Sequence, residues 1–175
     1  MPLVTETGEA LHNAESWGTA EGFVAYWEAR PHRTESEDLA NADDEHVEGA
    51  LRDAAQYITA AFEEWCKGWR VSNLQALAFP RLGMLDDHGY AMPTIPGCVI
   101  EAQYELASKV VLTGGALQTD QARGGNIKEE EVQAAVVRRK IVYGSTGAGQ
   151  DKVYSFVQKL LSPVLKSTGR KYVFR

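Results

Sequence analysis

One apolar stripe constrains the fold of this 175-residue chain more than any other feature. The stripe repeats at steps of three or four residues over five turns, and its members are Leu51, Ala54, Ala55, Ile58, Ala61, Phe62, Trp65 and Trp69. This period predicts an amphipathic helix from about Asp44 to Lys67, roughly 36 Å long at 1.5 Å per residue. Because such a helix must bury its stripe against other elements, the chain is expected to be mainly α-helical.

Shorter patterns of the same period predict further helices at about 19–30, 96–113 and 151–162. Residues 71–97 are rich in Pro and Gly and predict an ordered loop. Between 127 and 143 two patterns compete, because the acidic run at its start is typical of a helix and the Val and Ile residues after it favour strands. We favour extended structure there.

The expected fold is a small bundle of about four helices with long ordered loops, a short β-ribbon and an extended C-terminal arm. Residues 1–16 are polar and carry no periodic signal, so they are expected to form an N-terminal arm. Residues 17–166 form the helical domain. The last nine residues, 167–175, are basic and β-prone and form the C-terminal arm.

Charge and composition argue against several functional classes. The chain has 18 Lys and Arg against 24 Asp and Glu, a net charge of −6, whereas a free-standing nucleic-acid binder neutralises phosphates with clustered cations. No apolar run reaches the roughly 18 to 20 residues that span a bilayer, and the first residues do not resemble a signal peptide. Two cysteines are too few for a disulfide scaffold. Synthesis in the cytoplasm is therefore expected.

No motif predicts catalysis, a cofactor or a metal site. Gly144–Gly149 has the outer glycine spacing of a phosphate-binding loop, but Gln150 and Asp151 stand where Lys and Ser or Thr are required. The four histidines are scattered, and none pairs with a cysteine at metal-ligand spacing. No Ser or Cys lies in the sequence context of a nucleophile. The chain is not expected to be an enzyme.

Two basic segments are candidates for contacts with partners. Arg138, Arg139 and Lys140 form the only dense basic cluster, for which phosphate binding, a solvated strand edge and an ion-paired subunit contact all stay open. The second segment is the end of the chain: Arg170, Lys171, Tyr172, Val173, Phe174 and Arg175. It fits a peptide that adds a strand to a partner or inserts its aromatics there, with disorder as the alternative. Trp27, Trp65 and Trp69 are expected to pack in the core rather than to stack on bases.

The most specific motif begins with Trp65, Gly68 and Arg70 and continues as Leu77-Ala-Phe-Pro80-Arg81-Leu-Gly83. Together with Ala25-Tyr-Trp, Ala50–Ala55, Ile95-Pro96 and Leu160–Leu165, this motif resembles the head–tail connector, or adaptor, proteins of tailed bacteriophages. Many of those sequences are catalogued as DnaT-like single-stranded-DNA-binding proteins. The resemblance covers about residues 20–166, and Phe79 stands where the family usually has Trp.

The resemblance implies a helical subunit that assembles into a ring, typically of twelve copies, beneath the portal in the neck of the virion. It also implies that the C-terminal arm, with Arg170–Arg175, docks onto the portal protein and that the lower face receives the next tail or stopper component. Double-stranded DNA would pass through the ring without specific binding, which suits an acidic protein. The alternative is a replication-associated single-stranded-DNA-binding protein that uses Arg138, Arg139 and Lys140.

Overall fold

The computed structural model describes residues 2–115, 117, 127–133, 138–143 and 154–166. The chain divides into two units, a helical unit of residues 1–117 and 154–175 and a hairpin unit of residues 118–153. The hairpin unit is thus inserted between two segments of the helical unit. Each unit is described by itself.

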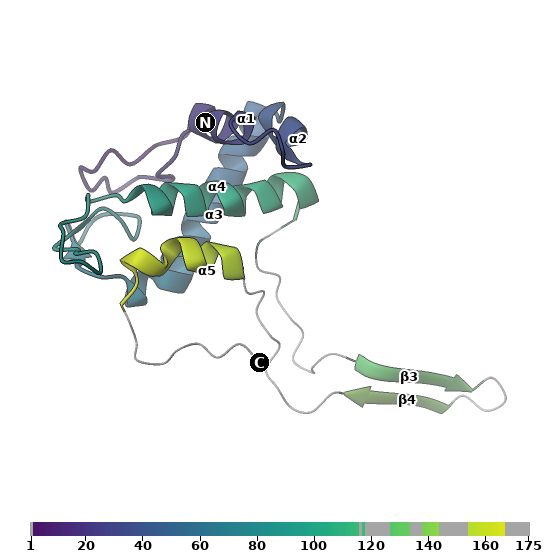
Figure 1. The fold of residues 1–175 in the computed structure, drawn as a ribbon. Coiled ribbons are helices and arrows are strands. Elements are labelled where there is room, and N and C mark those ends of the chain that lie inside the picture. Colours follow the sequence, from purple (N-terminus) through teal and green to yellow (C-terminus); the bar gives the residue numbers. More distant parts are fainter. Residues whose placement is uncertain (1, 116, 118–126, 134–137, 144–153, 167–175) are drawn as a thin grey trace. The chain divides into compact units, whose positions relative to one another are not determined.

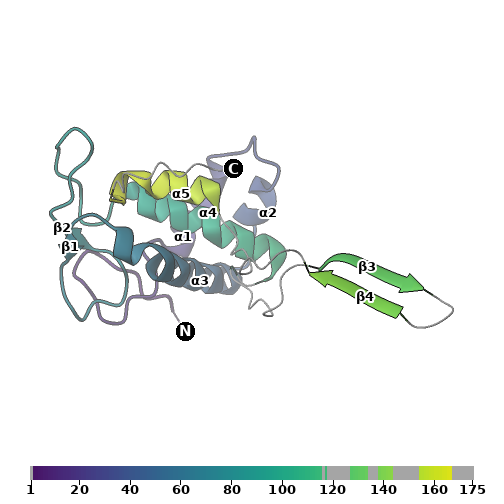
Figure 2. The ribbon, with the colours of Figure 1, turned by 90° about the horizontal axis from the view of Figure 1, so that it is seen from below.

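The described residues of the helical unit form five α-helices (Figure 1), two turns of 3₁₀-helix and one two-stranded ribbon, which is labelled in Figure 2. In chain order these are α1 (Ala20–Glu28), α2 (Ser36–Ala40), α3 (Asp44–Phe62), η1 (Glu63–Trp65), β1 (Trp69–Arg70), β2 (Arg81–Leu82), α4 (Gly97–Thr113), α5 (Ser155–Leu161) and η2 (Ser162–Val164). This architecture confirms the expected mainly helical fold. The additional helix, α2, lies in a polar segment without an apolar period, which is why its sequence did not predict it.

The core forms where α4 packs against α3 on one side and α5 on the other. The apolar stripe of α3 is buried as predicted, and Leu51, Ala54, Ala55 and Ile58 are all fully buried. The helix is shorter than expected, because it ends at Phe62 and continues as the 3₁₀ turn η1. No helix in the part of the chain that the structure describes is long and apolar enough to cross a membrane.

Local signals fix the ends of two helices. The hydroxyl of Thr19 accepts a hydrogen bond from the backbone N–H of Gly22 at 3.0 Å, which satisfies a donor that the first turn of α1 leaves unpaired. Gly114 follows α4 with φ of 62°, the left-handed conformation that glycine adopts without strain. Both ends lie where the sequence predicts them.

A buried amide joins the segment before α1 to the helical core. The side chain of Gln103, on α4, is fully buried. Its oxygen accepts from the backbone N–H groups of Trp17 and Gly18 at 3.1 and 3.0 Å. Its nitrogen donates to the Ser16 hydroxyl at 2.7 Å and to the Leu51 carbonyl at 2.9 Å. These four bonds connect α3, α4 and the lead-in to α1.

The segment expected to form an N-terminal arm is irregular and in contact with the helical unit. Glu6 is buried, and its carboxylate accepts backbone hydrogen bonds from Gly8, Ala10 and Leu11 at 2.8 to 3.0 Å. The carbonyl of Leu11 in turn accepts from the backbone N–H of Ala76. The segment therefore contacts the long loop that follows α3.

A second buried polar cluster connects α1 with α4. The carboxylate of Glu105 is 3% exposed and accepts hydrogen bonds from Arg33 at 2.6 Å and from the Tyr26 hydroxyl at 2.8 Å. Arg33 also lies over the ring of Trp27, 4.4 Å from its centroid. Because the buried carboxylate has a cation and a hydroxyl as partners, its desolvation is compensated within the fold.

The hairpin unit contains β3 (Ile127–Gln133) and β4 (Arg138–Tyr143), which pair antiparallel. The register places Glu131 opposite Lys140 and Val132 opposite Arg139, with an irregularity between Ile127 and Glu129. The expectation of extended structure is thereby confirmed for residues 127–133 and 138–143, and residues 134–137 lie outside the described residues. The glycine-rich segment 144–149 lies outside the described residues.

Candidate assembly surface

Large apolar side chains are exposed mainly on one segment of the helical unit. Nine are exposed in the described part of the chain, and seven of these fall between residues 65 and 90. We call these seven the apolar end: Trp65, Trp69, Val71, Leu74, Leu82, Leu85 and Tyr90. Exposed apolar side chains that gather on one segment make that segment a candidate for contact with a partner.

Two glycines allow the close approach of β1 and β2 that builds this surface. Gly68 has φ of 67°, and a Cβ atom there would lie 2.2 Å from the carbonyl oxygen of Leu82. Gly83 has φ of 70°, and its Cβ would lie 2.4 Å from the ring of Trp69. A side chain at either position would combine backbone strain with a clash. The two glycines of the sequence motif therefore hold Trp69 over the turn after β2.

Buried Arg81 connects the chain around Lys67 and Gly68 with the chain around Ala78 through hydrogen bonds. The residue is 8% exposed, and its guanidinium donates to the backbone carbonyls of Lys67 at 2.8 Å, Gly68 at 3.1 Å and Ala78 at 3.4 Å. The planar guanidinium carries several donors in fixed directions, so one side chain can satisfy carbonyls on different turns. Arg81 thus holds the chain before β1 against the chain before β2.

A second set of bonds closes the loop between β1 and β2. Buried Gln75 donates to the carbonyls of Leu77 at 2.8 Å and Pro80 at 3.0 Å and accepts from the backbone N–H of Ser72 at 3.1 Å. Arg70 donates to the carbonyl of Gln75 at 3.3 Å. The loop that carries Val71 and Leu74 is therefore ordered by its own polar groups, as the sequence predicts for residues 71–97.

The cations beside the apolar end are bonded within the unit. Lys67 pairs with Asp87 at 3.2 Å and donates to the carbonyl of Leu85 at 3.3 Å. Arg70 forms an ion pair with Glu63. Since Arg81 is bound by carbonyls, the three cations of residues 63–90 each have a partner inside the molecule. The segment they support exposes apolar side chains and also contains the acidic residues Glu64 and Asp86.

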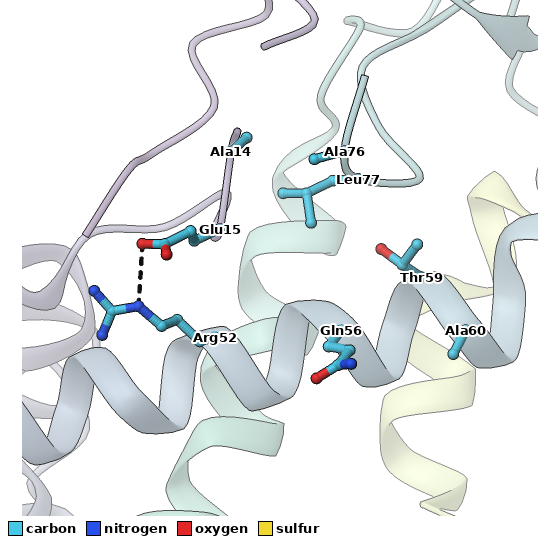
Figure 3. A pocket seen from close by; sticks show the side chains of 8 residues that line it. All are labelled: Ala14, Glu15, Arg52, Gln56, Thr59, Ala60, Ala76 and Leu77. Atoms are coloured by element: carbon cyan, nitrogen blue, oxygen red, sulfur yellow. Dashed lines mark hydrogen bonds and ion pairs between the residues drawn. The ribbon is translucent and has the colours of Figure 1, made fainter. Parts of the chain in front are cut away.

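A shallow cavity of about 330 Å³ opens on the exposed side of α3 (Figure 3). Its lining consists of Ala14, Glu15, Arg52, Gln56, Thr59, Ala60, Ala76 and Leu77. Glu15 pairs with Arg52 at 3.1 Å at one side of the cavity, and hydrogen bonds from the Val4 N–H and from Arg52 lower the pKa of the Glu15 carboxyl. Apart from this ion pair, Gln56 and Thr59, the lining is apolar, and the Thr59 hydroxyl accepts a hydrogen bond from the backbone N–H of Ala78 at 3.2 Å.

The cysteines are placed for packing. Cys66 is buried, and burial raises the pKa of its thiol to about 11, so it is protonated at neutral pH. Burial also raises the pKa of Cys98. Among the described residues, no group of three or more His, Cys, Asp or Glu is placed to hold a metal ion.

The structure brings together one of the three predicted residue sets. The motif residues Trp65, Gly68, Arg70, Pro80, Arg81 and Gly83 all belong to the segment that forms the apolar end. Arg138, Arg139 and Lys140 lie on β4, in the hairpin unit. The terminal set, Arg170, Lys171, Tyr172, Val173, Phe174 and Arg175, lies outside the described residues.

The prediction that Trp65 and Trp69 pack in the core is wrong, whereas the same prediction for Trp27 is confirmed. Trp27 is 1% exposed, Trp65 is 43% exposed and Trp69 is 62% exposed. The difference arises because α3 ends at Phe62, so the last two members of the stripe are no longer on the buried face of a helix. The glycine at position 68 was the signal that the helical period could not continue to Trp69.

Comparison with known protein families gives a match over the whole chain, residues 1–175, to the family described as "Putative DnaT-like ssDNA binding protein". No curated protein and no solved structure matches the chain. The match extends over both units and both ends of the sequence. The chain belongs to this DnaT-like family.

Proposed function

We propose that this protein is a structural subunit of a tailed bacteriophage, a head–tail connector that assembles into a ring below the portal. The observation that carries the proposal is the apolar end. Its seven exposed apolar side chains are supported by Gly68, Gly83 and Arg81, and its cations are already bonded. An ordered apolar surface whose polar groups are satisfied is suited to a protein partner. The resemblance of the Trp65–Gly83 motif to connector proteins supports the same function.

The distribution of charge is consistent with a wall around passing DNA. The helical unit contains 12 Lys and Arg against 19 Asp and Glu, a net charge of −7, and the hairpin unit contains 6 against 5, a net charge of +1. A ring of acidic subunits repels the phosphates of double-stranded DNA, so the DNA slides through without binding. In this proposal the terminal segment Arg170–Arg175 docks onto the portal, and the opposite face of the ring receives the next tail component.

The test is to measure the mass of the purified protein alone and with portal protein by analytical ultracentrifugation. We expect self-association and a portal complex, and we expect deletion of residues 170–175 to abolish the portal complex while leaving self-association intact. A protein that stays monomeric both alone and with portal would refute the connector function. Portal binding that survives the deletion would refute the docking role of the C-terminal arm.

Single-stranded-DNA binding is the second candidate, and the family description favours it. The exposed indoles of Trp65 and Trp69 lie in the segment that also holds Lys67 and Arg70, and aromatic rings beside cations can stack on unpaired bases. This function predicts sub-micromolar binding of a labelled oligothymidine, with quenching of tryptophan fluorescence and a steep dependence on salt. Two observations argue against single-stranded-DNA binding at this segment. Lys67 and Arg70 are already paired with Asp87 and Glu63, and the helical unit has a net charge of −7.

The two candidates are separated by one titration. Fluorescence anisotropy of the labelled oligonucleotide at about 50 mM salt, where phosphate contacts are strong, should show no binding if the protein is a connector. Binding that is lost in Trp69→Ser and weakened by added salt would establish the single-strand function. The matched control is Phe156→Ser, which removes a comparably exposed aromatic outside the apolar end.

A further inference from the structure

The β3–β4 hairpin has two strands and no further strand in the described residues to pair with. An isolated two-stranded hairpin is at best marginally stable in water, and each outer edge presents unpaired backbone N–H and C=O groups. The hairpin therefore needs another surface to become stable. The apolar end, by contrast, is an ordered surface that no residue in the described part of the chain covers.

Within the helical unit, the apolar end and the two points where the hairpin unit is inserted lie at opposite ends of α4. At the start of α4, the backbone N–H of Arg81 donates to the carbonyl of Thr94, two residues before the cap Pro96, so β2 lies beside this end (Figure 2). Beyond the other end, the chain leaves the helical unit after Leu117 and returns at Tyr154, whose hydroxyl donates to the Leu117 carbonyl at 2.8 Å. The 17 residues of α4 separate the two ends by about 25 Å.

We propose that the hairpin of one copy packs on the apolar end of the next copy. The proposal rests on the self-assembly of the proposed function and names the interface that produces it. A contact between two different surfaces of the same chain is a head-to-tail contact, and such contacts repeat from copy to copy until they close a ring. A contact between identical patches would stop at a dimer.

The chemistry of the two elements is complementary. β4 combines Ile141, Val142 and Tyr143 with the basic cluster Arg138–Lys140. The segment that forms the apolar end also contains four acidic residues, of which Glu63 and Asp87 are ion-paired with Arg70 and Lys67, and Glu64 and Asp86 form no ion pair among the described residues. The proposed contact therefore buries apolar residues of both copies at its centre and sets the basic strand near acidic residues at its rim, the arrangement typical of protein interfaces. It also assigns Arg138, Arg139 and Lys140 to a subunit contact, one of the three alternatives left open by the sequence.

Two variants that each lack one half of the contact test the proposal. The end variant, Leu74→Ser with Tyr90→Ser, removes the two most exposed side chains of the apolar end, each 72% exposed, and keeps the hairpin. The hairpin variant, Val132→Pro with Ile141→Pro, interrupts both strands and keeps the apolar end. We expect each variant alone to be monomeric. We expect an equimolar mixture to give a one-to-one dimer of twice the 19.2 kDa monomer mass, because one intact hairpin meets one intact apolar end.

Sedimentation velocity and circular dichroism measure the outcome. A control variant, Leu112→Ser with Phe156→Ser, loses two exposed apolar side chains outside the apolar end and should assemble like the unmodified chain. Suppose that the unmodified chain assembles but the mixture of folded variants yields no dimer. The hairpin of one copy then does not bind the apolar end of another copy, and this inference fails while the proposed function stands. Assembly in that case uses other surfaces. If the unmodified chain remains monomeric alone and with portal, the proposed function fails as well.

Discussion

Replacing Arg81 by methionine tests how the apolar end is held together. Methionine has a similar unbranched shape, so the substitution removes the guanidinium and keeps much of the packing. The substitution removes two short hydrogen bonds, to the carbonyls of Lys67 at 2.8 Å and Gly68 at 3.1 Å. It also removes a longer one, to the carbonyl of Ala78 at 3.4 Å. A hydrogen bond to a charged group contributes about 1.5 to 3 kcal/mol, and part of this is offset because the buried charge no longer has to be desolvated. We expect the free energy of unfolding to fall by about 3 kcal/mol.

The matched control is Arg52→Met, which removes the same group from a partly exposed position. Arg52 pairs with Glu15 and Glu48 on the surface of α3, and exposed ion pairs of this kind contribute about 0 to 1 kcal/mol. Urea denaturation followed by tryptophan fluorescence measures both variants. If Arg81→Met lowers the free energy of unfolding no more than Arg52→Met, the carbonyl contacts of Arg81 do not hold the segment and the reasoning is wrong. In the connector proposal, Arg81→Met also weakens self-association, whereas Arg52→Met does not.

Three further outcomes follow from buried groups. Gln103→Leu leaves the backbone N–H groups of Trp17 and Gly18 without their acceptor. This substitution should lower the free energy of unfolding by about 2 to 5 kcal/mol in the same urea assay. A loss below about 1 kcal/mol would contradict the role of the amide. Ellman's reagent at pH 8 should modify Cys66 far more slowly in the folded chain than in urea, because burial holds its pKa at about 11; equal rates would show that the thiol is accessible. Burial, and after it the hydrogen bond to the Glu105 carboxylate, raises the pKa of the Tyr26 phenol. The stability that this phenol contributes is therefore complete below the ordinary tyrosine pKa of about 10 and is lost as the pH rises above that value. Tyr26→Phe should make the melting temperature less dependent on alkaline pH, and an unchanged pH profile would show that another group causes the alkaline loss.

Periodicity predicted the parts of the fold that depend on local sequence. The stripe from Leu51 to Ile58 is buried as expected, and α1 and α4 begin and end within a few residues of the predicted positions. The strands at 127–143 were predicted from residue preference alone. These elements share a property, which is that each is specified by residues close together in the chain.

The apolar end could not be predicted in this way. Its form depends on contacts between residues that are distant in the chain. Examples are the hydrogen bond from Arg81 to the carbonyl of Lys67 and the close approach of the Trp69 ring to Gly83, which leaves no room for a Cβ atom. A hydrogen bond to a backbone carbonyl leaves no trace in the pattern of side chains, so the sequence marks Arg81 as a motif residue without showing what it binds. The residues of the Trp65–Gly83 motif lie on one segment of the structure, and the contacts of Gly68, Gly83 and Arg81 give a physical reason that they occur together.

The hydrogen bond between Tyr154 and the carbonyl of Leu117 has a consequence for engineering. This bond holds Leu117 and Tyr154, the two residues that flank the hairpin unit in the chain, next to each other. The helical unit therefore has adjacent ends at the site of the insertion. A bundle built this way tolerates exchange of the insert, because the core residues of α3, α4 and α5 lie outside residues 118–153. Hairpins of other lengths or sequences, or a reporter domain with adjacent termini, can be grafted between positions 117 and 154 without redesigning the scaffold.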